Sequence, residues 1–213
     1  MNKKILKWER WLDEIKQQIR SLLWSRQIYN ETFDIIRANP LLPNQNSLYG
    51  AMQMWYSASA LSGIRRQLKS GDQSISLAGL LEDIRDNPAL LSRARWLKLH
   101  EGFPLPGHAD QVFRQYAGDG DFINPAIVET DLLSLKEIST KCEAYSDKRV
   151  AHHDKGTEPE VPTYEELDAT LASLDALFRK YFVLVTAKNA LTDTSIAYNW
   201  KQVFRHPWIP PAT

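Results

Sequence analysis

The hydrophobic positions of this chain recur with the period of an α-helix over most of its length, and no segment shows the alternation typical of a β-strand. The first 39 residues carry hydrophobic residues at spacings of three and four, which predicts one long helix. It should end at Asn39-Pro40, because proline cannot continue a helix, and a break near Ser25 is an open alternative. Its predicted buried stripe is Ile5, Trp8, Leu12, Ile15, Ile19 and Leu22.

Three further long helices are predicted from the same period. The second covers about 47–69, with Ser47 as its N-cap and Gly71 beyond its end. The third begins with Pro125 at its first position and runs to His152, and the fourth covers about 163–185, with Thr163 as its N-cap. Their predicted stripes are Ala51, Met54, Ala58, Leu61, Arg65 and Leu68; Val128, Leu132, Leu135, Ile138, Cys142 and Tyr145; and Leu167, Leu171, Leu174, Phe178, Tyr181 and Val185.

Shorter helices are predicted at about 76–86, 88–100, 110–116 and 193–204. The predicted fold is therefore all-α, a bundle of four long helices with short accessory helices. We expect one domain over 1–213, with an insertion or lid at about 86–122 that is bounded by turn-rich segments, although two small domains are an alternative.

The composition of the chain excludes several classes of protein and of binding site. The 213 residues include 26 Lys+Arg and 26 Asp+Glu, so the net charge is zero and a globally basic nucleic-acid-binding protein is excluded, but a local basic patch is not. The single cysteine, Cys142, excludes an intrachain disulfide and a cysteine-based zinc site. No apolar run approaches the ~20 residues of a membrane span and no signal segment is seen, so we expect a cytoplasmic protein without membrane contact. We expect no cofactor and no bound metal, since no phosphate-binding loop or paired ligand motif is present.

Candidate chemistry lies at the end of the third long helix. Arg149 and His152 are three residues apart, so they would share one face of an α-helix, and His153 would lie on an adjacent edge. An arginine can hold phosphate oxygens with its planar fork, and a histidine can move a proton near neutral pH. The alternative is that these cations stabilise the negative end of the helix dipole.

A second candidate is Arg65, which falls in the hydrophobic stripe of its helix. A guanidinium in such a position needs an anionic partner, and Asp72, Asp147 and Asp154 are the carboxylates considered. The pair could be a structural salt bridge, or Arg65 could contribute to the same pocket as His152.

Together these segments resemble the HEPN superfamily, in particular its abortive-infection, Abi-U-type branch. The first match is Ile64-Arg65-Arg66, Asp72, Ser76-Leu77 and Leu80-Leu81. The second match is Asp147-Lys148, Val150, Ala151-His152 and Asp154. The two matches occur in the family's order and together bracket about 90 residues.

The resemblance implies a helical homodimer that cleaves RNA without a metal ion, in phage defence or in a toxin–antitoxin-type system with a partner protein. It implies His152 as the acid/base. The expected arginine position is occupied by Ser146, so Arg149 is the candidate in its place. Expected substrate-binding residues are Arg65, Lys148, His153 and Asp147. The alternative is a non-catalytic HEPN-like module that binds RNA, a nucleotide or a partner protein.

A competing enzymatic interpretation takes His153-Asp154 as the His-Asp pair of an HD-type metal phosphohydrolase. That chemistry would need further ligands from neighbouring helices, and His100, His108 and His206 are the remaining histidines.

Overall fold

The structure, a computed structural model, describes residues 2–43, 45–71, 74–102, 107–151, 159–189, 192 and 199–206, with the backbone alone for 149–151. Within these residues the secondary structure is helical apart from one isolated β-bridge, so the all-α prediction is confirmed. The α-helices are α1 (Lys3–Ala38), α2 (Ser47–Leu68), α3 (Leu77–Arg85), α4 (Arg93–Leu99), α5 (His108–Ala117), α6 (Pro125–Tyr145) and α7 (Tyr164–Thr186). None of the described helices is both long and apolar enough to cross a membrane.

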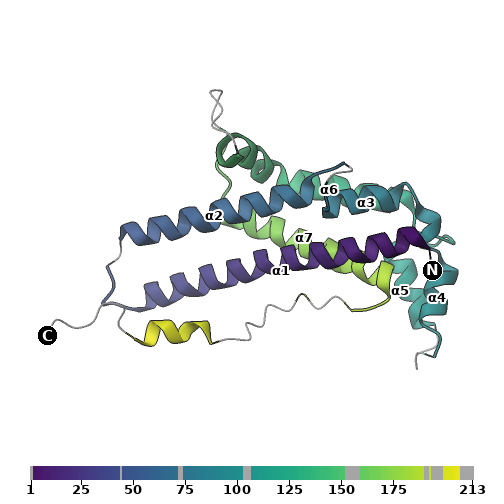
Figure 1. Cartoon of the computed structure of the whole chain (residues 1–213), viewed down its shortest axis with the longest axis horizontal. Coiled ribbons are helices and arrows are strands. Elements are labelled where there is room, and N and C mark those ends of the chain that lie inside the picture. The colour runs from purple at the N-terminus through teal and green to yellow at the C-terminus, as the bar shows by residue number, and fades with distance from the viewer. Residues whose placement is uncertain are drawn as a thin grey trace.

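Helices α1 and α7 contribute much of the core, and their stripes were predicted correctly. All six predicted positions of each stripe are buried. Helix α1 packs against α7 and α2, and α6 packs against α7, α2 and α3 (Figure 1). Helix α1 is continuous through Ser25, so the alternative of a break there is wrong, and it ends at the C-cap Asn39 as expected. Thr163 caps α7 in a capping box with Glu166.

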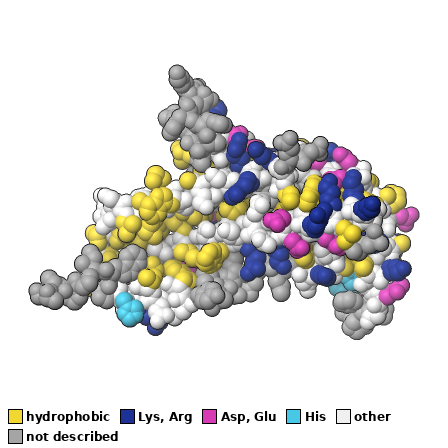
Figure 2. Space-filling view, in the orientation of Figure 1, with side chains coloured by type: hydrophobic (Ala, Val, Ile, Leu, Met, Phe, Trp, Pro, Cys, Tyr) yellow, Lys and Arg dark blue, Asp and Glu magenta, His cyan; other side chains and the backbone are white. Residues whose placement is uncertain are grey.

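Helix α2 is buried mainly from Tyr56 onwards. Leu61 and Leu68 are buried, but the predicted stripe position Met54 is 62% exposed and its neighbour Trp55 is 60% exposed. The predicted stripe is therefore wrong in the first half of α2, where described neighbours leave these side chains uncovered (Figure 2). The N-cap is Asn46, whose side chain accepts a hydrogen bond from the Leu48 amide, so Ser47 is the first helical residue.

Helix α6 begins with Pro125 in its first turn, as predicted, behind the N-cap Asn124. Ile138, predicted to be buried, is 42% exposed. The α-helix ends at Tyr145 and not near residue 152, because the chain changes there to a π-helix, described below as the π-helical turn (Ser146–Ala151).

The segment expected to form an insertion or lid contains a 3₁₀ helix (Pro88–Leu90), α4 and α5, which lie near the N-terminal end of α1 (Figure 1). The two ends of this segment meet at the bridge between Ser92 and Phe122. Trp96 of α4 is buried, and its indole donates a hydrogen bond to the Ala109 carbonyl at 2.6 Å. Of the helix predicted at 193–204, residues 193–198 lie outside the described residues, and Trp200–Arg205 form a 3₁₀ helix.

Candidate functional site

The π-helical turn is the first feature of the candidate site. It continues α6 without interruption, and the Ser146 amide donates to the carbonyls of Cys142 and Glu143. A π-helix bonds each amide to the carbonyl five residues earlier, and such turns occur frequently at functional sites. Arg149 lies within this π-helical turn, whereas His152 lies outside the described residues, so the expected shared face of these two residues stays a prediction.

Arg65 connects α2 to the π-helical turn. Its Nε donates to Asp147 Oδ1 in an ion pair between residues 82 positions apart in the sequence. Of the three carboxylates considered as its partner, the structure selects Asp147. The side chains are 30% and 48% exposed, so the pair is worth at most about 1 kcal/mol of stability. Asp147 accepts a hydrogen bond from Nε only, and no described residue accepts one from the two Nη groups of Arg65. The guanidinium can therefore still bind an anion through its Nη groups.

Ser146 stands where the resemblance expects an arginine. The structure buries it to 1% exposure, and its hydroxyl oxygen has no hydrogen-bond partner. An arginine side chain at this position would have to leave the packed interior to reach solvent. The expected phosphate-binding charge must therefore come from other residues.

The remaining predicted residues are only partly described. Lys148 is exposed on the π-helical turn, and for Arg149 the backbone alone is described. His152, His153 and Asp154 lie outside the described residues. On α2, Arg66 and Lys69 are exposed close to Arg65 in the sequence. In Figure 2, Lys and Arg side chains gather over the C-terminal half of α2, whereas hydrophobic side chains gather over its N-terminal half.

A groove, which the sequence did not predict, lies between α2, the end of α6 and the start of α7. It has a volume of about 520 Å³, and Leu61 and Tyr145 line it close in sequence to Arg65 and Ser146. Apolar and aromatic side chains dominate its walls, with Gln53 and Ser57 as polar groups. Its other lining residues are Met54, Ala58, Val161, Pro162, Tyr164 and Leu167. The sequence offered one indication of this groove: Tyr145, an aromatic residue, lies two positions before the Asp147-Lys148 segment of the resemblance.

Three tyrosines stack beside the groove. The Tyr29 ring lies 4.2 Å from the Tyr56 ring and 5.5 Å from the Tyr164 ring, measured between centroids. Tyr164 is 39% exposed and lines the groove itself. Burial raises the pKa of Tyr56 to about 12, and burial together with hydrogen bonding to Tyr164 raises the pKa of Tyr29. Tyr29 and Tyr56 therefore stay neutral at physiological pH.

The described histidines of the competing metal-site interpretation lie on three different elements. His100 is the C-cap of α4, with its ring against Trp96 at 4.2 Å, and His108 begins α5, whereas His206 follows the last 3₁₀ helix. Among the described residues, no group of three or more histidines, cysteines or carboxylates is arranged to hold a metal ion. His153 and Asp154 lie outside the described residues.

Comparison with protein-family models, curated proteins and solved structures gives no significant match for this chain.

Proposed function

We propose that this chain is a HEPN-like, metal-independent endoribonuclease whose centre lies where α2 meets the π-helical turn. The observation that carries the proposal is the Arg65–Asp147 ion pair. It brings together the two sequence segments on which the resemblance rests, although they are far apart along the chain.

Each part of this region has a role in RNA cleavage. The 2′-oxygen of the RNA attacks the adjacent phosphorus and the bond to the 5′-oxygen breaks, which leaves a 2′,3′-cyclic phosphate and a 5′-hydroxyl. His152 transfers the protons, and Arg65, Lys148 and Arg149 stabilise the phosphate charge. Asp147 holds Arg65 in place through Nε, and His153 extends the substrate-binding surface.

The groove supplies a place for a base. Sequence-specific proteins bind single-stranded RNA by stacking its bases on aromatic side chains, and Tyr145 and Tyr164 line this groove. Gln53 and Ser57 offer hydrogen bonds to a base edge. Since the net charge of the chain is zero, affinity for RNA should come from the local cations and should fall with salt.

The biological setting follows from the resemblance. We propose that the chain acts as a homodimer in phage defence or in a toxin–antitoxin-type system, where a partner protein restrains it.

A second candidate function is a non-catalytic HEPN-like module that binds RNA, a nucleotide or a partner protein. One observation favours it. The position at which the resemblance expects a catalytic arginine holds Ser146, which is buried and cannot supply charge to a substrate.

The test measures cleavage and binding of labelled single-stranded RNA in excess EDTA. The purified full chain is compared with His152→Ala and Arg65→Ala, and Arg37→Ala is the matched control because Arg37 is 69% exposed on α1. We expect cleavage in EDTA that is lost in His152→Ala, and a loss of affinity in Arg65→Ala of roughly tenfold or more, as for a hydrogen bond to a charged group. Arg37→Ala should behave as the parent chain.

The other outcomes separate the alternatives. Binding that depends on Arg65 without any cleavage supports the non-catalytic module. Cleavage that EDTA abolishes supports the metal interpretation at His153-Asp154. Absence of both binding and cleavage contradicts an RNA function at this site.

A further inference from the structure

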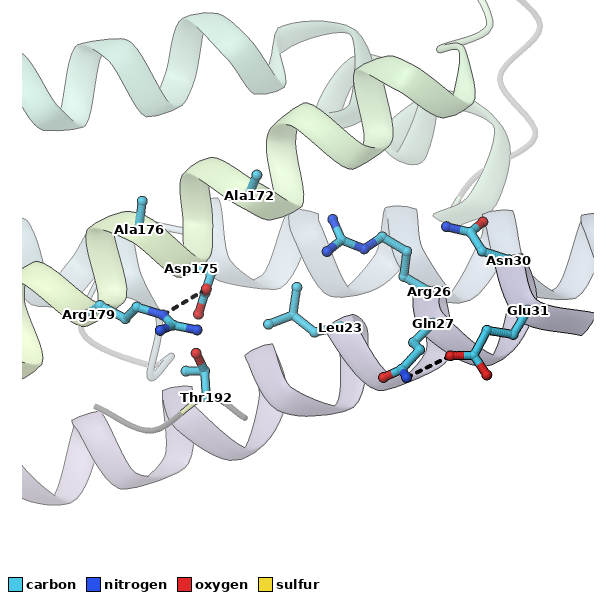
Figure 3. A pocket seen from close by; sticks show the side chains of 10 residues that line it. All are labelled: Leu23, Arg26, Gln27, Asn30, Glu31, Ala172, Asp175, Ala176, Arg179 and Thr192. Atoms are coloured by element: carbon cyan, nitrogen blue, oxygen red, sulfur yellow. Dashed lines mark hydrogen bonds and ion pairs between the residues drawn. The ribbon is translucent and has the colours of Figure 1, made fainter. Parts of the chain in front are cut away.

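A second cavity lies between α1 and α7 and has a volume of about 630 Å³, within the range of ligand pockets. None of its lining residues belongs to the π-helical turn or to the groove beside it. Ala172 and Ala176 of α7 and Leu23 of α1 are among the residues that line it (Figure 3). The short side chains of the two alanines leave this part of the α7 surface open.

Three polar atoms of the lining residues have no hydrogen-bond partner. They are Gln27 Oε1, Asp175 Oδ1 and Thr192 Oγ1, and each is buried. An unsatisfied buried polar atom costs about 1–3 kcal/mol, and such atoms are rare enough that each needs an explanation. Apart from Ser146, these are the unpartnered buried side-chain atoms of the described residues, so they concentrate at this one cavity.

The two helical acceptors are held in place by their own helices. Gln27 Nε2 donates to Glu31 Oε1 at 2.8 Å, which leaves the amide oxygen as the unpartnered atom. Asp175 Oδ2 accepts from Arg179 Nε at 2.8 Å, which leaves Oδ1. Both interactions join residues four apart on one helix, so the acceptors are oriented before any ligand binds. Thr192, at 1% exposure, adds a hydroxyl from the segment after α7.

The cavity also presents positive charge. Arg26 of α1 lines it, and its Nε is 3.9 Å from the nearest Asp168 oxygen, which is too long for a hydrogen bond. In Figure 3, Asp175 and Thr192 lie towards one end of the cavity, and Arg26 and Gln27 lie towards the other. Asp175, its helical partner Arg179 and Thr192 therefore form one end of the cavity, and Arg26 and Gln27, with Glu31 beside them, form the other.

We propose that this cavity binds a free α-amino acid. Its ammonium group would donate to Asp175 Oδ1 and Thr192 Oγ1, and its carboxylate would pair with Arg26. A side chain with an N–H donor, as in glutamine or asparagine, would satisfy Gln27 Oε1. The lining contains two arginines and two carboxylates, so a zwitterion matches its balanced charge better than a simple cation or anion.

The experiment uses the full chain and measures thermal shift and calorimetric affinity for the free amino acids, with ethylamine and acetate as single-charge probes. We expect amino acids with N–H side chains to bind, and ethylamine and acetate to bind at least tenfold more weakly, because each supplies half of the contacts. Ala176→Leu fills the cavity and should abolish binding. Ala169→Leu, at an exposed position of α7 that does not line the cavity, is the matched control and should bind as the parent chain.

Thr192→Val, which removes a hydroxyl with little change of shape, should weaken binding several-fold. Three results would overturn the proposal: no amino acid binds the parent chain, binding survives in Ala176→Leu, or ethylamine binds as tightly as the best amino acid. RNA cleavage plays no part in these readouts, so this inference stands or falls independently of the proposed function.

Discussion

Gly63 of α2 lies against Leu22 of α1, and its replacement tests the packing that positions Arg65 two residues later. A Cβ at Gly63 would lie 2.4 Å from one Cδ of Leu22 and 3.0 Å from the other. Leu22 is buried, so its side chain can move only by displacing neighbours. Gly50 lies on the same helix, is exposed, and has nothing within 4 Å of an added Cβ.

The two glycines therefore form a matched pair. Gly50→Ala should raise the free energy of unfolding by about 0.5–1 kcal/mol, the helix-propensity difference between the two residues. Gly63→Ala gains the same helix-propensity stabilisation but also overpacks the α1–α2 contact, which costs about 1–3 kcal/mol. Because the propensity gain is common to both variants, their free energies of unfolding should differ by about 1–3 kcal/mol. Their melting temperatures should then differ by roughly 2–12 °C in a chain of this length.

The assay is chemical and thermal unfolding of the two variants beside the parent chain. Leu22→Ala provides the check on mechanism, because it removes the atoms that an added methyl at Gly63 would meet. In that background, Gly63→Ala should no longer destabilise, and the two changes should be clearly non-additive. If Gly63→Ala is as stable as Gly50→Ala, the two helices do not approach each other as described.

Two further predictions concern buried polar groups. Ser146→Ala should raise the free energy of unfolding by about 1 kcal/mol, because it removes a buried hydroxyl without a partner; a loss of stability in denaturant unfolding would show that the hydroxyl is satisfied. Burial raises the pKa of Asp83, but hydrogen bonds from Trp8, Lys4 and Lys7 outweigh it and hold the pKa below its usual value. The stabilisation from the ionised Asp83 is complete above about pH 4 and is lost as the pH falls through its folded-state pKa. Asp83→Asn should therefore lower the free energy of unfolding by about 1–2 kcal/mol at pH 7 and by little near pH 2, as measured in unfolding titrations.

Matched controls exist for both changes. Ser139 is as buried as Ser146, but its hydroxyl donates to the Leu135 carbonyl, so Ser139→Ala should lower stability by about 0.5–1.5 kcal/mol. Asp34 pairs with Arg37 at the surface with both side chains about two-thirds exposed, so Asp34→Asn should change stability at pH 7 much less than Asp83→Asn. An equal loss of stability in the two variants would contradict the assignment to Asp83.

Part of the candidate site could be predicted from the sequence. Arg65 was recognised as a guanidinium that needs a carboxylate, because a charge within an apolar stripe is costly alone. Three carboxylates remained possible, and only the position of the π-helical turn beside α2 selects Asp147. Ser146 lies four residues after the buried Cys142, so its burial continues the buried face of α6, but a serine carries no apolar signal from which that burial could be predicted.

Local interactions determined the helices themselves. The stripes of α1 and α7, the cap at Thr163 and the stop at Asn39 depend on residues within a few positions of one another, and such patterns can be read along the chain. Tertiary structure decided which of those faces are covered. Met54 has the same periodic position as buried residues but faces no described neighbour that covers it, and residues from α1 and α7 together line the cavity that neither helix forms alone. Burial and cavities depend on the two surfaces that pack together, whereas the periodicity of a helix describes only its own surface.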